Sequence, residues 1–198
     1  MSAAVFPGAE AVLAVARRLA GGAAPALLAI DGRCGSGKST LAAWLAEQLP
    51  CNLVHMDDFY LPMDRRRPDW AEHPGANMDF ARLCAQVLAP LLAGQEAAYR
   101  AYACRRGELL PAVALPPRPL TIVEGSYALH PALDVPYACR VFLTCAPACQ
   151  RARLQKREGG RYPAFVQRWI PLEEGYLAAE HPERGCDIVL DTTGAAVV

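Results

Sequence analysis

Short apolar runs alternate along the chain with segments in which apolar residues recur at helical spacing. The apolar runs predict buried strands, at residues 26–30, 51–55, 120–125, 140–145 and 186–190. The helical spacing predicts helices, at residues 10–19, 41–49, 80–93, 147–157, 164–170 and 172–180. Strands that alternate with helices in this order indicate a parallel α/β sheet with helices on both faces.

The segments between these elements are polar or rich in glycine and proline. Residues 56–77 contain several prolines and arginines and are expected to form an irregular loop. Residues 97–104 alternate in polarity, which is typical of an edge strand in a hairpin, and residues 111–119 are expected to be a proline-rich connection. A pair of glycines within residues 158–163 predicts a flexible break between two helices.

The composition fits a single domain with a packed core, because the chain has 198 residues and 53% of them are hydrophobic. Its 20 Lys and Arg residues balance its 20 Asp and Glu residues, which disfavours a general nucleic-acid binder or a polybasic membrane anchor. No apolar run is long enough for a membrane helix and no signal peptide is evident, so we expect a cytoplasmic protein. The eight cysteines lack the spacing of a disulfide framework or a zinc site, which favours reduced thiols.

A glycine-rich turn follows the first predicted strand and leads into a predicted helix. Residues 32–39 match the pattern G-x-x-x-x-G-K-[ST] in full, and Lys38 is one of only two lysines, the other being Lys156. The glycines of this pattern let backbone N–H groups point at phosphate oxygens, and the following helix directs its positive end at the same anion. We therefore expect ATP and Mg²⁺ as cofactors, with Lys38 on the β- and γ-phosphates and Ser39 on the metal. The predicted nucleotide-binding residues are Gly32, Arg33, Cys34, Gly35, Ser36, Gly37, Lys38, Ser39 and Thr40.

Other motifs restrict the class of P-loop protein. Neither lysine follows an asparagine, so the N-K-x-D motif with which GTPases read guanine is absent. The chain also lacks the Asp-Glu strand end that is usual in ATPase motors and the LSGGQ signature of transporters. The remaining class is a small kinase that transfers phosphate to a small molecule.

Three groups of charged residues fit such a kinase. Asp57 and Asp58 follow the second strand, where a carboxylate can accept the proton of an attacking hydroxyl or bind the metal through water. Glu124 ends the third strand, a position suited to holding Mg²⁺ or its water ligands. Arginines on the following helix and break can neutralise the transferred phosphoryl group and close as a lid. These arginines are Arg151, Arg153, Arg157 and Arg161.

Four segments together resemble the uridine kinase and phosphoribulokinase family of P-loop small-molecule kinases: residues 32–40, 56–60 and 120–127 and the arginine helix. The resemblance covers most of residues 26–190. It implies a three-layer α/β sandwich with a mostly parallel five-stranded sheet, in one domain spanning residues 1–198. It also implies a small lid at about residues 157–163 and a hairpin on the acceptor side, within an insertion at about residues 60–106.

The resemblance assigns roles to individual residues. Asp57 matches the general base of the family, and Glu124 matches a ligand in the magnesium shell, where Ser39 and Asp58 are the other expected ligands. Lys38 is a catalytic residue, as are two lid arginines, Arg157 and Arg161.

The acceptor pocket is harder to assign, because the family holds its acceptor with an acidic or amide residue on the loop after residue 60. Glu72, Asn77 and Asp79 all fit that description, and Asp79 can equally cap the following helix. The expected acceptor-binding residues are therefore Asp57, Tyr60, Glu72, Asn77, Asp79 and Tyr102.

Two departures from the family leave the acceptor open. Uridine kinases carry Arg-Gly-Arg in the lid, where this chain has Gly159-Gly-Arg161. The hairpin histidine that reads the pyrimidine is not evident after Tyr102, where Cys104-Arg-Arg106 stands. A nucleoside is the favoured acceptor, and a sugar, a pantothenate-like alcohol or a vitamin nucleoside are alternatives.

A nucleotide-binding regulatory module without kinase activity is the alternative from another functional class. The expected partner is a small-molecule acceptor, with no nucleic acid and no membrane. The sequence leaves the oligomeric state open, a homo-oligomer included.

Overall fold

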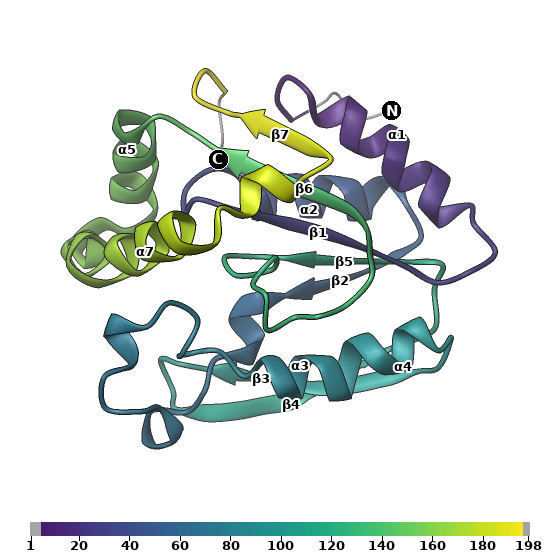
Figure 1. Cartoon of the computed structure of the whole chain (residues 1–198), viewed down its shortest axis with the longest axis horizontal. Coiled ribbons are helices and arrows are strands. Elements are labelled where there is room, and N and C mark those ends of the chain that lie inside the picture. The colour runs from purple at the N-terminus through teal and green to yellow at the C-terminus, as the bar shows by residue number, and fades with distance from the viewer. Residues whose placement is uncertain (1–4, 196–198) are drawn as a thin grey trace.

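The computed structural model describes residues 5–195 and has a five-stranded sheet at its centre (Figure 1). The strands lie in the order β2-β5-β1-β6-β7, and every neighbouring pair is parallel. Their bounds are β1 (Ala26–Gly32), β2 (Cys51–His55), β5 (Leu120–Glu124), β6 (Tyr137–Thr144) and β7 (Ile188–Asp191). The five predicted strands are thus all present. The apolar runs of β1 and β5 are buried on both faces, as central parallel strands require, whereas the edge strands β2 and β7 are partly exposed.

One face of the sheet is covered by α1 (Ala9–Ala20) and α2 (Lys38–Gln48). Their apolar side chains pack on those that the strands direct to this face, including Leu28, Ile30 and Val141. The second helix begins three residues before the predicted start at residue 41, because the glycine-rich turn leads directly into it.

The other face is covered by a helical stretch and a hairpin (Figure 1). The stretch consists of α3 (Phe80–Leu83), a π-helical segment and α4 (Ala89–Leu92), and Asp79 caps it by accepting a hydrogen bond from the Arg82 amide at 3.1 Å. Both faces of the sheet are therefore buried, which confirms the predicted three-layer α/β fold.

The hairpin pairs β3 (Ala97–Ala103) with β4 (Glu108–Leu115) in antiparallel register. The first strand was predicted, but the prediction that residues 111–119 form a connection is wrong, since β4 continues to Leu115. A register shift between Arg100 and Tyr102 lies opposite Pro111, and it accommodates a residue that cannot donate a ladder hydrogen bond. The Arg100 side chain donates instead to the carbonyls of Leu109 and Leu110, at 2.8 and 2.6 Å.

The segment after β6 stays helical almost throughout. It consists of α5 (Pro147–Glu158), a 3-10 turn at Gly159–Arg161, α6 (Tyr162–Ala164), a π-helical segment and α7 (Ile170–Glu180). The predicted break at residues 158–163 is present, because α5 ends at Glu158 and Gly159 leaves the helical conformation with a φ of 54°. The Glu158 carboxylate pairs with Arg157 and Arg161, at 2.8 and 3.1 Å, and these contacts hold the turn despite its two glycines.

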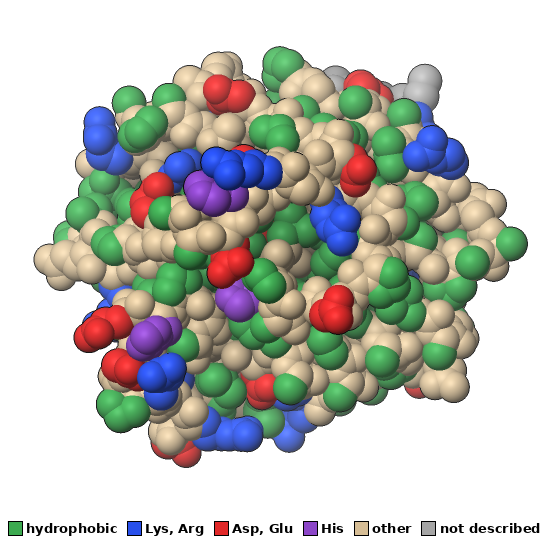
Figure 2. Space-filling model, in the orientation of Figure 1, with side chains coloured by type: hydrophobic (Ala, Val, Ile, Leu, Met, Phe, Trp, Pro, Cys, Tyr) green, Lys and Arg blue, Asp and Glu red, His purple; other side chains and the backbone are tan. Residues whose placement is uncertain are grey.

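The remaining connection, residues 56–77, contains only short 3-10 turns, as expected for an irregular loop. All eight cysteines carry free thiols. Within residues 5–195, no helix has the length and apolar character needed to cross a membrane. Basic and acidic side chains are interspersed over the face shown in Figure 2, in line with the balanced net charge.

Candidate functional site: a P-loop facing a carboxylate

The glycine-rich turn between β1 and α2 adopts a conformation that only its glycines permit. Gly32 has a φ of 136°, and a Cβ at this position would overlap the carbonyl oxygen of Leu143 on β6. The Lys38 side chain folds back over the turn, and its amine donates to the carbonyls of Gly32 and Arg33 at 2.7 and 3.0 Å. The amine is thereby held above the loop rather than in solvent.

The loop turns its carbonyl groups toward the protein. The carbonyls of residues 34–36 accept hydrogen bonds from Gln150, Arg153 and Thr192, at 3.0, 3.0 and 2.8 Å. α5 and the segment after β7 thus hold the backbone carbonyls of the loop on one side. The backbone amides of the loop face the opposite side.

The amides of the loop fit a polyphosphate. In the described part of the chain, the N–H groups of Gly35, Gly37 and residues 38–40 have no protein acceptor. The side-chain oxygen of Ser36 is also buried without a partner. A row of unpaired amides at a helix start, beside a lysine amine, is the arrangement that binds phosphate groups.

The loop opens on a cavity of about 1120 Å³. It brings together segments that are far apart in the sequence: the P-loop, the start of the 56–77 loop, the end of β5, the arginine helix α5 and the lid before α7. Of the predicted site residues, those that line the cavity are Cys34, Gly35, Gly37, Lys38, Ser39, Thr40, Asp57, Tyr60, Glu124, Arg157 and Arg161.

Asp57 is the carboxylate that faces the P-loop across this cavity. Burial raises its pKa above the ordinary 3.8, and the negative charge of Glu124 raises it further, while a hydrogen bond with Tyr60 and the charge of Lys38 lower it. Burial, together with the nearby Asp57, also raises the pKa of Tyr60 well above its ordinary value, so its hydroxyl remains a donor. A carboxylate with a raised pKa is a better proton acceptor for a hydroxyl than an exposed aspartate.

Glu124 connects the end of β5 to the P-loop. Its carboxylate lies 3.2 Å from the Ser39 hydroxyl and 2.5 Å from Nδ1 of His55, and this hydrogen bond raises the pKa of His55. Mg²⁺ at phosphoryl-transfer sites commonly takes one or two protein oxygens and completes its coordination with water and phosphate. The oxygens of Ser39 and Glu124 fit that requirement.

The lid arginines line the part of the cavity wall that α5 and the turn after it form. Arg157 and Arg161 share the Glu158 carboxylate, and the Arg157 guanidinium lies over the Phe165 ring at 5.6 Å from its centre. About half of each arginine side chain is exposed, so both guanidinium groups can still reach an anion in the cavity.

Five of the predicted metal and acceptor residues do not line the cavity. Asp58 is not placed as a metal ligand, because its carboxylate accepts a hydrogen bond from the Tyr99 hydroxyl at 2.8 Å. That bond fixes the 3-10 turn to the hairpin, and so directs the neighbouring Asp57 toward the P-loop. The other four do not line the cavity either: Glu72 is exposed, Asn77 is buried in the loop, Asp79 caps α3 and Tyr102 packs in the hairpin.

Two further residues of the P-loop have surroundings that the motif does not specify. Arg33 points away from the cavity and pairs with Glu174 on α7. Cys34 lines the cavity, but burial raises the pKa of its thiol to about 12, which disfavours the reactive thiolate that a redox-sensitive cysteine needs.

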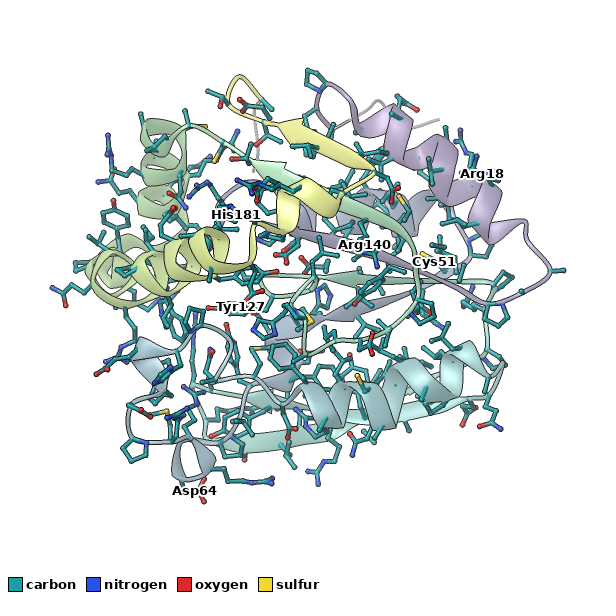
Figure 3. All side chains as sticks on the ribbon, in the orientation of Figure 1. Arg18, Cys51, Asp64, Tyr127, Arg140 and His181 are labelled. Atoms are coloured by element: carbon teal, nitrogen blue, oxygen red, sulfur yellow. The ribbon has the colours of Figure 1, made fainter. Side chains whose placement is uncertain are left out.

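The cavity also contains residues that the motifs did not single out. Glu173 on α7 is buried, and its carboxylate accepts hydrogen bonds from the Cys34 amide and the Ser126 hydroxyl at 2.6 and 3.1 Å. Tyr127, the residue after Ser126, has a left-handed backbone conformation with a φ of 73°. Figure 3 shows it near the middle of the molecule beside α7. Lys156 also lines the cavity, and the rarity of lysine in the sequence was a signal for it. No comparable signal marked Glu173, because its place depends on how α7 packs.

No protein-family model and no curated protein sequence matches the chain. Several solved structures are similar to the chain. A protein from Bacillus stearothermophilus described as a possible uridine kinase is similar at a TM-score of 0.72 and 22% identity, over 92% of this chain and 97% of that chain. The fold is that of a P-loop kinase. A protein from Silicibacter sp. TM1040, provisionally described as a fructose transport system kinase, matches at a TM-score of 0.68 and 24% identity, over 92% of this chain and 98% of that one.

These likenesses confirm the fold expected from the motifs and extend over nearly the full length of both relatives. The P-loop kinase fold places the ends of β1, β2 and β5 at one edge of the sheet, where the cavity lies.

Proposed function

We propose that this protein is an ATP- and Mg²⁺-dependent kinase that transfers a phosphoryl group to a hydroxyl of a small molecule. One observation carries the proposal: Lys38 of the P-loop and the buried carboxylate of Asp57 line the same cavity. A nucleotide-binding module without a transfer reaction has no need of a proton acceptor in that place.

The chain's own residues supply positioning and charge in such a reaction. Mg²⁺-bound ATP supplies the phosphoryl group that is transferred. The P-loop amides and Lys38 hold the polyphosphate, and Ser39 with Glu124 binds the metal. Asp57 orients the hydroxyl of the acceptor and takes its proton, and the lid arginines balance the charge of the transferred group.

The favoured acceptor from the sequence resemblance is a nucleoside, as in uridine kinases. A sugar, a pantothenate-like alcohol and a vitamin nucleoside are the alternatives. All four classes offer a hydroxyl to Asp57, so the transfer chemistry is the same for each.

The proposal is tested with radiolabelled ATP, and in parallel GTP, against a panel of hydroxyl compounds from these classes. We expect transfer to at least one compound. We expect Lys38→Ala to lower turnover by more than about 100-fold, because it removes a charge that stabilises the transition state. Asp57→Asn should retain nucleotide binding and lose transfer to a similar extent.

Asp64→Asn is the matched control for Asp57→Asn, since Asp64 is an exposed aspartate of the same loop outside the cavity (Figure 3). Its turnover should equal that of the unmodified protein. Full transfer by Asp57→Asn would refute the assignment of the base. Phosphate release without a phosphorylated product from any compound would favour the regulatory module instead.

A further inference from the structure

The turn of the β3–β4 hairpin carries two neighbouring arginines with different surroundings. Arg106 pairs with Glu108 at 3.1 Å and does not line the cavity. Arg105 does line the cavity, and within residues 5–195 its side chain forms no ion pair and no hydrogen bond. The hairpin therefore presents one unpaired guanidinium group to the cavity.

Arg105 lines the same cavity as Asp57. Its hairpin packs on the 3-10 turn that carries Asp57, because the Tyr99 hydroxyl donates to the Asp58 carboxylate at 2.8 Å and the Phe59 and Tyr99 rings stack at 4.9 Å. The adjacent Cys104 lies beside the 56–77 loop, since the Arg66 guanidinium donates to its sulfur at 3.9 Å. The turn thus stands over the space in which an acceptor hydroxyl would approach Asp57.

The carboxylates that line the cavity are already engaged elsewhere. Glu158 pairs with the two lid arginines, Glu173 accepts from the P-loop, and Glu124 accepts from Ser39. The fourth carboxylate that lines the cavity is that of Asp57, and no ion pair joins it to Arg105. A guanidinium group without a carboxylate partner, at the wall of a ligand cavity, is suited to bind an anionic group of the ligand.

We infer that the acceptor carries an anionic group, a carboxylate or a phosphate, which Arg105 binds while the acceptor hydroxyl faces Asp57. This inference rests on the proposed function and narrows it, because it excludes an uncharged nucleoside such as uridine. It also accounts for the sequence at this turn, where Cys104-Arg-Arg106 stands in place of the histidine expected of a uridine kinase.

The test compares hydroxyl compounds in matched pairs that differ in one anionic group. The carboxylate pairs are pantothenate with panthenol and glycerate with glycerol. The phosphate pairs are ribose 5-phosphate with ribose and uridine 3′-monophosphate with uridine. Binding is measured by isothermal titration calorimetry without ATP, and phosphorylation is measured separately.

For at least one pair, we expect the anionic compound to bind at least about 10-fold more tightly than its neutral partner. Arg105→Gln should weaken that binding about 10- to 100-fold and leave the neutral partner unchanged. Arg106→Gln is the matched control and should change neither. The pair that responds identifies the anion as a carboxylate or a phosphate.

The inference is overturned if the neutral compounds bind as tightly as the anionic ones, if no anionic compound binds, or if Arg105→Gln affects both members of a pair equally. The proposed function fails in a different way. Anion binding that depends on Arg105, with no compound phosphorylated, would leave the anion site in place and remove the kinase. Rapid phosphorylation of a neutral nucleoside, unaffected by Arg105→Gln, would keep the kinase and remove the anion site.

Discussion

At the scale of single residues, Asp57 shows how one side chain is tuned by the groups around it. Burial and the charge of Glu124 raise its pKa, whereas Tyr60 and Lys38 lower it, and Asp58 contributes a further rise. In the proposed reaction the deprotonated form is the proton acceptor, so we expect activity to be lost as the pH falls through the pKa of Asp57. Because that pKa is raised, the loss begins at a higher pH than for an exposed aspartate.

This reasoning predicts the effect of Tyr60→Phe on the pH dependence. The substitution removes a hydrogen bond that stabilises the charged carboxylate, so the pKa of Asp57 rises further. The acid limb of the kcat/KM profile should move to higher pH. The value of kcat/KM at high pH should change less than its value on the acid limb. Profiles of both proteins measure this shift, and a limb that stays in place or moves to lower pH would contradict the role of Asp57.

The sequence predicted some residues of the site and missed others for a physical reason. Lys38 and Ser39 belong to a contiguous motif, and Asp57 and Glu124 follow buried strands whose carboxyl ends meet at one edge of the sheet. Glu173 reaches the P-loop only because α7 packs beside it, which no local pattern records.

At the scale of elements, patterns of burial were easier to predict than patterns set by single contacts. The five central strands are apolar runs, so their prediction needed no knowledge of the neighbouring elements. The second hairpin strand is largely exposed and contains Pro111, and at that point it has one residue more than its partner strand. The lid turn contains two glycines, of which Gly159 leaves the helical conformation, and Glu158 pairs with Arg157 and Arg161 across this turn.

The junction between β1 and α2 is the element boundary least tolerant of change. In Gly32→Ala, the added Cβ would overlap the Leu143 carbonyl in a backbone conformation that alanine rarely adopts. We expect a loss of more than about 3 kcal/mol of unfolding free energy, measured by urea unfolding. Gly160→Ala is the control, because nothing lies within 4 Å of its Cβ position, and it should cost less than about 1 kcal/mol. Equal stability of the two variants would show that the strand–loop junction is less constrained than its geometry indicates.

At the scale of the whole molecule, the cavity is assembled from segments that only the sheet brings together. The P-loop, the Asp57 turn and the end of β5 come from strand ends, whereas the hairpin turn and the lid come from the helical and antiparallel layers around them. The first group contains the P-loop side of the cavity, and the second group lies where the proposed function places the acceptor. This division explains why the fold and the nucleotide loop were predictable and the acceptor pocket was not.

Because the proposed nucleotide site joins β1, α2 and α5, its occupation should stabilise the folded chain as a unit. Mg²⁺-bound ATP at about 100 times its Kd should raise the unfolding free energy by about 2.7 kcal/mol. For a domain of this size, that corresponds to a rise in Tm of about 5–10 °C. Lys38→Ala should abolish most of the rise, and Asp57→Asn should keep it, since Asp57 faces the acceptor. Thermal unfolding with ATP, with Mg²⁺ and ATP, and with EDTA added separates the two cofactors without requiring any acceptor. A rise that is equal in the unmodified protein and in Lys38→Ala would mean that the nucleotide binds elsewhere.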